Sequence, residues 1–310
     1  MNEPYALESM NAGDGAHLLA LTRSVGWHFS AKQPDLYLRT GLVVGHRDGE
    51  KWISCAGFYA YGQALASVGH LIVDPAYQGQ GLGKRLMLRC LAEATKTGSA
   101  VTLVSTKSGF PLYTSLGFQT VGYAHRFLYD VPAEGLRHER SSSAEGDLVP
   151  LNEAVLPEVI ELDQTAAGVR RERVLRSIDE HKISGWAVRD SSGAMQGYGF
   201  ARAKDDILVV GPLVSSDADM AVRLLKVLIA GWQGRIQLDV PGVQASFQER
   251  LRGLDFRETS VSPQMLLGAS SLPGRRELLF ALADPAFGLE PGRPLSSQVR
   301  DYWTDVQNLS

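Results

Sequence analysis

The chain has 310 residues, a hydrophobic fraction of 44% and a net charge of −3, the composition of a globular protein with room for two domains. The small net negative charge does not indicate a surface that binds polyanions, so we expect no nucleic-acid partner. No apolar run reaches the ~18 residues of a membrane helix, so we expect no membrane partner. Residues 1–15 lack the basic start and apolar core of a signal peptide, which favours a cytoplasmic location. Cys55 and Cys90 stand in separate apolar segments without metal-ligand spacing, so we expect neither a metal nor a disulfide.

Hydrophobic periodicity divides the first half of the chain into strands, a helix, a strand, a short helix and a strand. The long helix ends at Gly98, and the short one starts around Pro111 and ends at Gly117. In chain order, the expected elements are strands at 52–62 and 64–73, a helix at 81–97, a strand at 100–105, a short helix at 110–116 and a strand at 119–131.

The second half repeats this order. Its expected elements are a hairpin at 183–203, a strand at 206–214, a helix at 217–232, a strand at 235–240, a helix at 243–253, and strands at 255–260 and 276–283. Aligned without a gap, residues 71–86 lie over residues 208–223, with Val73 on Val210 and Pro75 on Pro212. We interpret this similarity as an internal duplication.

Between the halves, the polar residues 132–150 include three consecutive serines and a proline near each end, which predicts a linker. The expected domains are therefore residues 1–131 and 151–310. Their element order predicts an α/β fold in which each domain is a mixed, mostly antiparallel sheet flanked by helices.

Three glycines lie within five residues at the start of the long helix, in the stretch Gln78-Gly79-Gln80-Gly81-Leu82-Gly83. Such glycines let backbone amides close on a phosphate. A Walker A loop would need glycine at position 78 and a hydroxyl at position 85, which is arginine. A Rossmann fingerprint starting at Gly79 would need a third glycine where Lys84 stands. Both are excluded by spacing.

The stretch fits the pattern Gln/Arg-x-x-Gly-x-Gly/Ala between a strand and a helix. It resembles the coenzyme A loop of the GNAT N-acetyltransferase superfamily, and residues 111–118, PLYTSLGF, are similar to that family's second signature. The resemblance covers residues ~5–130, and the two-domain layout resembles tandem GNAT proteins with a divergent second copy. It implies splayed central strands in each domain and an acyl-CoA co-substrate, with acetyl-CoA as the expected donor.

The amides of residues 79–84 precede the first full helical turn, so they lack intrahelical partners and lie at the positive end of the helix dipole. A diphosphate matches this position in size and sign. The resemblance also implies that the pantetheine arm bonds to the preceding strand. The expected cofactor-binding residues are Leu71, Ile72, Val73, Gln78, Gly79, Gln80, Gly81, Leu82, Gly83 and Lys84. The alternative is a glycine-rich turn that only caps a helix.

Transfer of an acyl group to an amine needs a base for the amine and a proton for the departing thiolate. Tyr113 matches the family position beside the sulfur and is the candidate general acid. His70, on the motif strand, is the candidate base, although a structural histidine explains it equally well. Trp27 and His28 fall where the family binds its acceptor, and the alternative is a tryptophan that fills a gap between helices.

Where the first half has its glycine loop, the second has Ser215–Met220 with no glycine. We expect its serines and aspartates to cap their own helix, and Asp217 and Asp219 to repel a diphosphate. Leu251 stands where the first half has Tyr113. We therefore expect the second domain to shape the acceptor side rather than bind the cofactor.

These observations favour an acetyl-CoA-dependent N-acetyltransferase that acts on the amine of a small molecule by direct attack on the thioester. Two alternatives remain: a CoA-binding regulatory module without turnover, and a protein lysine or N-terminal acetyltransferase. The sequence does not name the acceptor, the acyl-chain length or the oligomeric state. Nor does it decide whether a residue or a water chain is the base.

Overall fold

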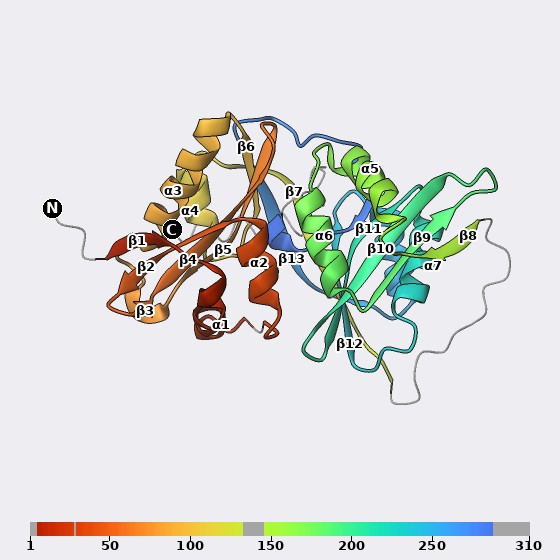
Figure 1. Ribbon diagram of the computed structural model, residues 1–310, viewed down its shortest axis with the longest axis horizontal. Coiled ribbons are helices and arrows are strands. Elements are labelled where there is room, and N and C mark those ends of the chain that lie inside the picture. The colour runs from red at the N-terminus through yellow and green to blue at the C-terminus, as the bar shows by residue number, and fades with distance from the viewer. Residues whose placement is uncertain (1–4, 28, 133–145, 288–310) are drawn as a thin grey trace. The chain divides into compact units, whose positions relative to one another are not determined.

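The computed structural model describes residues 5–27, 29–132 and 146–287. The described residues form two compact units, one of residues 5–103 with residues 286–287 and the other of residues 104–285. Each unit is an α/β structure with a mostly antiparallel sheet flanked by helices (Figure 1), as the sequence predicts. No helix among the described residues is long and apolar enough to cross a membrane.

In the first unit the sheet order is β1-β2-β4-β5-β6, with β3 paired to β2. Its strands are β1 (Ala6–Ser9), β2 (Leu42–Asp48), β3 (Lys51–Trp52), β4 (Ser54–Tyr61), β5 (Leu65–Val73) and β6 (Ala100–Val104), and its helices are α1 (Gly15–Ser24), α2 (Gln33–Thr40) and α3 (Leu82–Thr97). Among the strands that the structure describes in this unit, the parallel pair is β5 with β6, over Leu65–Ser67 and Ala100–Thr102. Helix α3 buries Leu86, Met87 and Cys90 and ends at Gly98, whose φ of 70° only glycine adopts readily.

In the second unit the order is β13-β7-β12-β11-β10-β9-β8. Its strands are β7 (Gln119–Asp130), β8 (Asp147–Pro150), β9 (Ser184–Arg189), β10 (Met195–Lys204), β11 (Ile207–Ser215), β12 (Arg235–Pro241), β13 (Arg257–Leu267) and β14 (Leu279–Ala281). Its helices are α4 (Phe110–Ser115), α5 (Leu156–Ala167), α6 (Glu172–His181), α7 (Ala218–Leu228) and α8 (Ala245–Gly253). The core lies where α7 and α8 pack on the sheet, around Leu224, Phe247 and Leu251.

The compact units are not the two halves of the sequence. Strand β7 comes from the first half, but it is hydrogen-bonded along one edge to β12 and along the other to β13. The two compact units therefore meet between Leu103 and Val104, and the expected domain boundary at residues 132–150 stays a prediction. Strand pairing is non-local, so a boundary based on composition does not report it.

The segment expected to be a linker is partly a strand. Residues 147–150 form β8, which pairs antiparallel with β9 from Asp147↔Arg189 to Pro150↔Trp186. The apolar pair Leu148 and Val149 suits this position at a sheet edge. Residues 133–145 lie outside the part of the chain that the structure describes.

Candidate active site

The glycine loop joins the end of β5 to the start of α3, over residues 74–81. Gly79 and Gly81 both have a φ of 76°, in the left-handed region. A Cβ atom at either position would have no atom within 4 Å. Backbone conformation rather than crowding therefore requires glycine here, and the loop surface is open.

The N-terminus of α3 has no side-chain cap among the described residues. Its first hydrogen bond runs from the Arg85 amide to the Gly81 carbonyl, at 3.1 Å. The amides of Leu82, Gly83 and Lys84 thus have no intrahelical acceptor and lie at the positive end of the helix dipole. This set of donors, with the exposed Lys84 beside it, fits a diphosphate.

The turn before the loop is held by its own side chains. Asp74 accepts a hydrogen bond from the Ala76 amide at 3.0 Å and pairs with Lys51 at 2.8 Å. The hydrogen bond from Lys51, followed by that from the Ala76 amide, lowers the pKa of Asp74. Asp74 is therefore a turn residue. Gln78 donates from Nε2 to the Val73 carbonyl at 3.1 Å, which ties the loop to the last residue of β5.

His70 lies at a bulge in β5. The register with β4 changes between Cys55↔Ile72 and Gly57↔Gly69, and His70 has a φ of 52°, unusual for a residue with a side chain. Its side chain is buried, and Nδ1 lies 3.1 Å from the Tyr59 hydroxyl. Of the other strand residues expected at the cofactor, Ile72 is buried, while Leu71 and Val73 are partly exposed.

Aromatic rings connect His70 to Trp27. Trp27 stacks on Phe29 with ring centroids 6.4 Å apart, and Phe29 meets the His70 ring edge-on at 5.4 Å. The structure thus places one of the two predicted acceptor-pocket residues in the cluster that surrounds His70. The other, His28, lies outside the described residues.

Tyr113 is on the short helix α4, which Pro111 helps to start. It is buried, and a Cβ on Gly109 would lie 2.7 Å from its ring, so Gly109 allows the ring to pack closely on the backbone. Tyr113 belongs to the second compact unit and His70 to the first. The structure therefore describes the two catalytic candidates in separate units.

The corresponding turn of the second half is much shorter. Only residues 216–217 separate β11 from α7, whereas residues 74–81 separate β5 from α3. The gapless alignment is therefore wrong, because Val210 and Pro212 lie inside β11 while Pro75 lies beyond the end of β5. The glycine loop of residues 74–81 is therefore six residues longer than the turn between β11 and α7.

The N-terminus of α7 is closed, as predicted. The Asp217 carboxylate accepts a hydrogen bond from the Met220 amide at 2.8 Å, and the Ser216 hydroxyl donates to the same carboxylate at 2.9 Å. Asp219 pairs with Arg250. Asp217 at the N-cap and Asp219 in the first turn thus place two acidic side chains where a phosphate would need free amides.

A further segment fills the space where β11 and β12 separate. These strands pair only over Ile207–Val209 with Arg235–Gln237. Beyond that point β14 pairs with β11 at Leu213↔Ala281 and Val214↔Leu279, and the Leu282 amide donates to the Asp239 carbonyl of β12 at 2.9 Å. Strand β14 and Leu282 therefore occupy the gap between the parallel strands β11 and β12.

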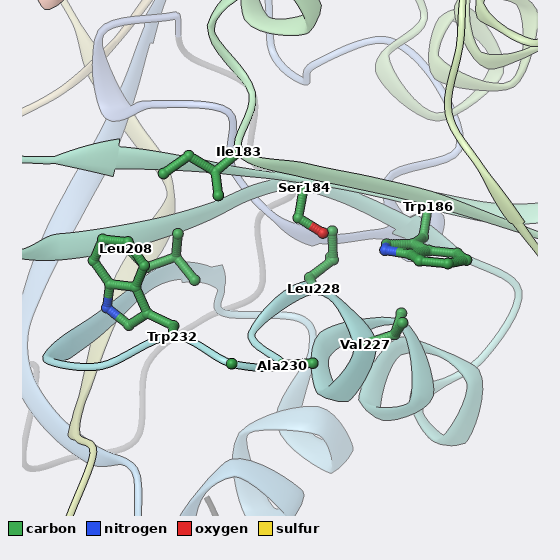
Figure 2. A pocket seen from close by; sticks show the side chains of 9 residues that line it. Ile183, Ser184, Trp186, Leu208, Val227, Leu228, Ala230 and Trp232 are labelled. Carbon is green, nitrogen blue, oxygen red and sulfur yellow. The ribbon is translucent and has the colours of Figure 1, made fainter. Parts of the chain in front are cut away.

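The second unit also has a cavity of about 340 Å³ at the C-terminal end of α7 (Figure 2). Indole rings of Trp186 and Trp232 contribute to its wall. Its lining residues are Ile183, Ser184, Trp186, Leu208, Val227, Leu228, Ala230, Gly231 and Trp232. The cavity lies at the end of α7 opposite Asp217, and none of its lining side chains is charged. It therefore does not provide the second unit with a site for a diphosphate.

Protein-family models match both halves of the chain. A model of the acetyltransferase (GNAT) domain matches residues 39–127, and a second model of that description matches residues 159–281. The uncharacterized N-acetyltransferase YitH of Bacillus subtilis is 29% identical over 276 residues, 87% of this chain and 94% of that protein. N-alpha-acetyltransferase RimI of Mycobacterium tuberculosis is 36% identical over 150 residues, 45% of this chain and 94% of that protein.

A solved structure shows the same fold over nearly the whole chain. The putative acetyltransferase from Pyrococcus horikoshii superposes with a TM-score of 0.77 at 16% identity, over 93% of this chain and 97% of that one. The chain belongs to the GNAT N-acetyltransferase family and carries two tandem GNAT domains.

Sequence reasoning missed the residues that surround His70. These are Phe29, Tyr37 and Tyr59, with Phe287 packed behind Tyr37 and Tyr59. Tyr59 could have been found from the sequence, because it shares one face of a predicted strand with Tyr61. The turn after that strand places Tyr59 beside β5. Phe287 has none, since it lies more than 200 residues away along the chain.

Proposed function

We propose that this protein is an acetyl-CoA-dependent N-acetyltransferase that acts on the amine of a small molecule. The uncapped N-terminus of α3, opened by Gly79 and Gly81, is the observation that carries the proposal. When bound, acyl-CoA supplies an acyl group activated as a thioester. In this proposal Gln78–Lys84 bind its diphosphate, and the backbone of Leu71–Val73 binds the pantetheine arm.

Two side chains handle the protons. His70 accepts a proton from the attacking amine, because only a neutral amine is nucleophilic and free alkyl amines are mostly protonated near neutral pH. Tyr113 donates a proton to the departing sulfur. One C–N bond forms, one C–S bond breaks, and the products are an amide and a free thiol. A backbone amide near Ile72 or Val73 stabilises the negative charge that develops on the carbonyl oxygen.

A small acceptor is supported by how the first unit covers His70. Tyr37 of α2, Phe29 and Phe287 all pack around the face of β4 and β5 that carries His70. Aromatic side chains around the proposed base suit a small amine with an apolar body. The protein-acetyltransferase alternative has its own support, since the Mycobacterium tuberculosis relative is named an N-alpha-acetyltransferase.

Thiol release from acetyl-CoA, followed with Ellman's reagent, tests the proposal with three sets of acceptors: small primary amines, peptides with free N-termini and lysine peptides. The assay has little background from the protein, because burial raises the pKa of Cys55 and of Cys90 to about 12 and keeps both thiols protonated. We expect turnover with a small amine. Turnover with peptides alone supports the protein-acetyltransferase alternative, and CoA binding without release from any set supports a regulatory module.

A further inference from the structure

The backbone at His70 is held in a strained conformation. A φ of 52° costs free energy for a residue with a Cβ and persists only where neighbours fix it. One of these neighbours is Cys55, whose thiol donates to the His70 carbonyl at 3.3 Å. The bulge turns the imidazole towards the face of the sheet that carries Tyr59.

On that face the imidazole is enclosed by three rings. The Tyr37 ring centroid lies 3.9 Å from that of His70, and Phe29 lies edge-on at 5.4 Å. The Tyr59 hydroxyl meets Nδ1 at 3.1 Å. Phe287 packs behind this layer, against Tyr59 at 4.9 Å and Tyr37 at 5.7 Å. Two of the three rings that contact His70, those of Tyr37 and Tyr59, thus rest on Phe287, which lies more than 200 residues away along the chain.

The segment that carries Phe287 is built into the first unit. The Tyr61 hydroxyl donates to the Phe287 carbonyl at 2.8 Å, and the Ser67 hydroxyl donates to the Ala286 carbonyl at 3.0 Å. A Cβ on Gly69, the residue before His70, would overlap Ala286. The Phe287 side chain is fully buried. Strand β5 therefore has two residues, Ser67 and Gly69, that accommodate this segment next to the bulge.

We propose that Phe287 is a positioning residue for His70. By packing against Tyr59 and Tyr37 it holds the Tyr59 hydroxyl at Nδ1, so that Nδ1–H donates to the Tyr59 oxygen and Nε2 keeps the lone pair that accepts a proton. The inference rests on the proposed role of His70 as the base. Through Ala286 and Phe287, the second half of the sequence then helps to position the proposed base, which lies in the first half.

The tautomer of His70 is the direct readout. Long-range ¹H–¹⁵N spectra of the full chain labelled at histidine should show the Nδ1–H form of His70 predominating in the wild type. In Phe287→Ala this signal should shift towards the mixture of tautomers found in a mobile imidazole. We expect kcat to fall about 10-fold, with the KM for acetyl-CoA changed by less than about twofold. Tyr59→Phe should give the same spectral change.

Phe247→Leu is the matched control, because Phe247 is an equally buried phenylalanine in the core of the second unit. It should lower stability without altering the His70 signal. Phe287→Leu keeps more of the buried volume and serves if the alanine variant does not fold. An unchanged His70 tautomer and kcat in a folded Phe287 variant would overturn the inference. The spectral test needs no turnover, so it separates this failure from failure of the proposed function.

Discussion

Gly81 and Asp217 occupy the same position, directly before α3 and α7, and have opposite effects on the amides that follow. Gly81 has no side chain to cap its helix and adopts a φ of 76°, while Asp217 is extended and accepts a hydrogen bond from the Met220 amide. The donors that a phosphate needs are thus available in the first half and satisfied in the second. One duplicated helix start has become a candidate cofactor site and the other a closed cap.

Gly81→Ala should weaken CoA binding. Alanine at this φ costs about 1–2 kcal/mol, so the loop will relax away from the conformation that exposes the amides. We expect the dissociation constant to rise by about 5- to 30-fold, measured by calorimetry. The matched control is Gly62→Ala in the turn between β4 and β5, where φ is 75° and a Cβ also meets open space. It should lower stability to a similar extent and leave CoA affinity unchanged. Equal loss of affinity in both variants would show that general destabilisation, not the loop, is responsible.

Asp217→Ala should destabilise the second unit without creating a CoA site. Loss of an N-cap costs about 1 kcal/mol, so the urea midpoint should fall. Asp217→Asn keeps a capping oxygen and should remain close to the wild type. CoA binding should not increase in either variant, because the turn has only residues 216–217 and β14 occupies the neighbouring gap. A second bound CoA in the alanine variant would contradict this account.

Tyr113→Phe removes one hydroxyl from the proposed general acid. We expect kcat to fall by about 10²-fold while the KM for acetyl-CoA changes little, since the ring and its packing on Gly109 remain. Steady-state kinetics with the acceptor found in the thiol-release assay measure both values. Tyr129→Phe, on β7, is the control and should keep the wild-type kcat. A Tyr113 variant with full activity would remove this residue from the mechanism.

The second unit should lose stability at alkaline pH through Tyr198. This buried phenol donates a hydrogen bond to Asp163, which also pairs with Arg171 at 2.7 Å. Burial, and then the charge of Asp163, raise the pKa of Tyr198 well above its ordinary value. The unfolded phenol titrates near pH ~10, so the folded form binds the proton more tightly. The stabilisation is complete below that pH and is lost as the pH rises above it.

Chemical denaturation at a series of pH values from about 8 to about 11.5 measures the free energy of unfolding across this titration. The free energy of unfolding should fall more steeply above pH ~10 in the wild type than in Tyr198→Phe. Equal slopes for the two proteins would refute a buried phenol as the cause.

The sequence predicted the elements that local signals determine. The helix from Leu82 to Gly98 follows its apolar period and its C-terminal glycine, and the β4–β5 turn falls at Gly62 as expected. The self-capped start of α7 was also predictable, because aspartate at an N-cap is a local preference.

Pairing across long stretches of chain was not predictable. The alternation in β7 shows that it is a strand but does not show that its neighbours are β12 and β13. The six-residue shortening before α7 was hidden because Val210 and Pro212 match Val73 and Pro75 by residue type. The orientation of His70 depends on a bulge, which changes the face a side chain occupies, and no residue pattern marked it.

Site-resolved titration of CoA into the ¹⁵N-labelled protein tests the central claim most directly. Amide resonances of Gly79–Lys84 should show the largest shifts, because their N–H groups are the proposed donors to the diphosphate, and those of Ser216–Met220 should stay in place. Shifts centred on Ser216–Met220, or no shift at either helix start at saturating CoA, would contradict the account.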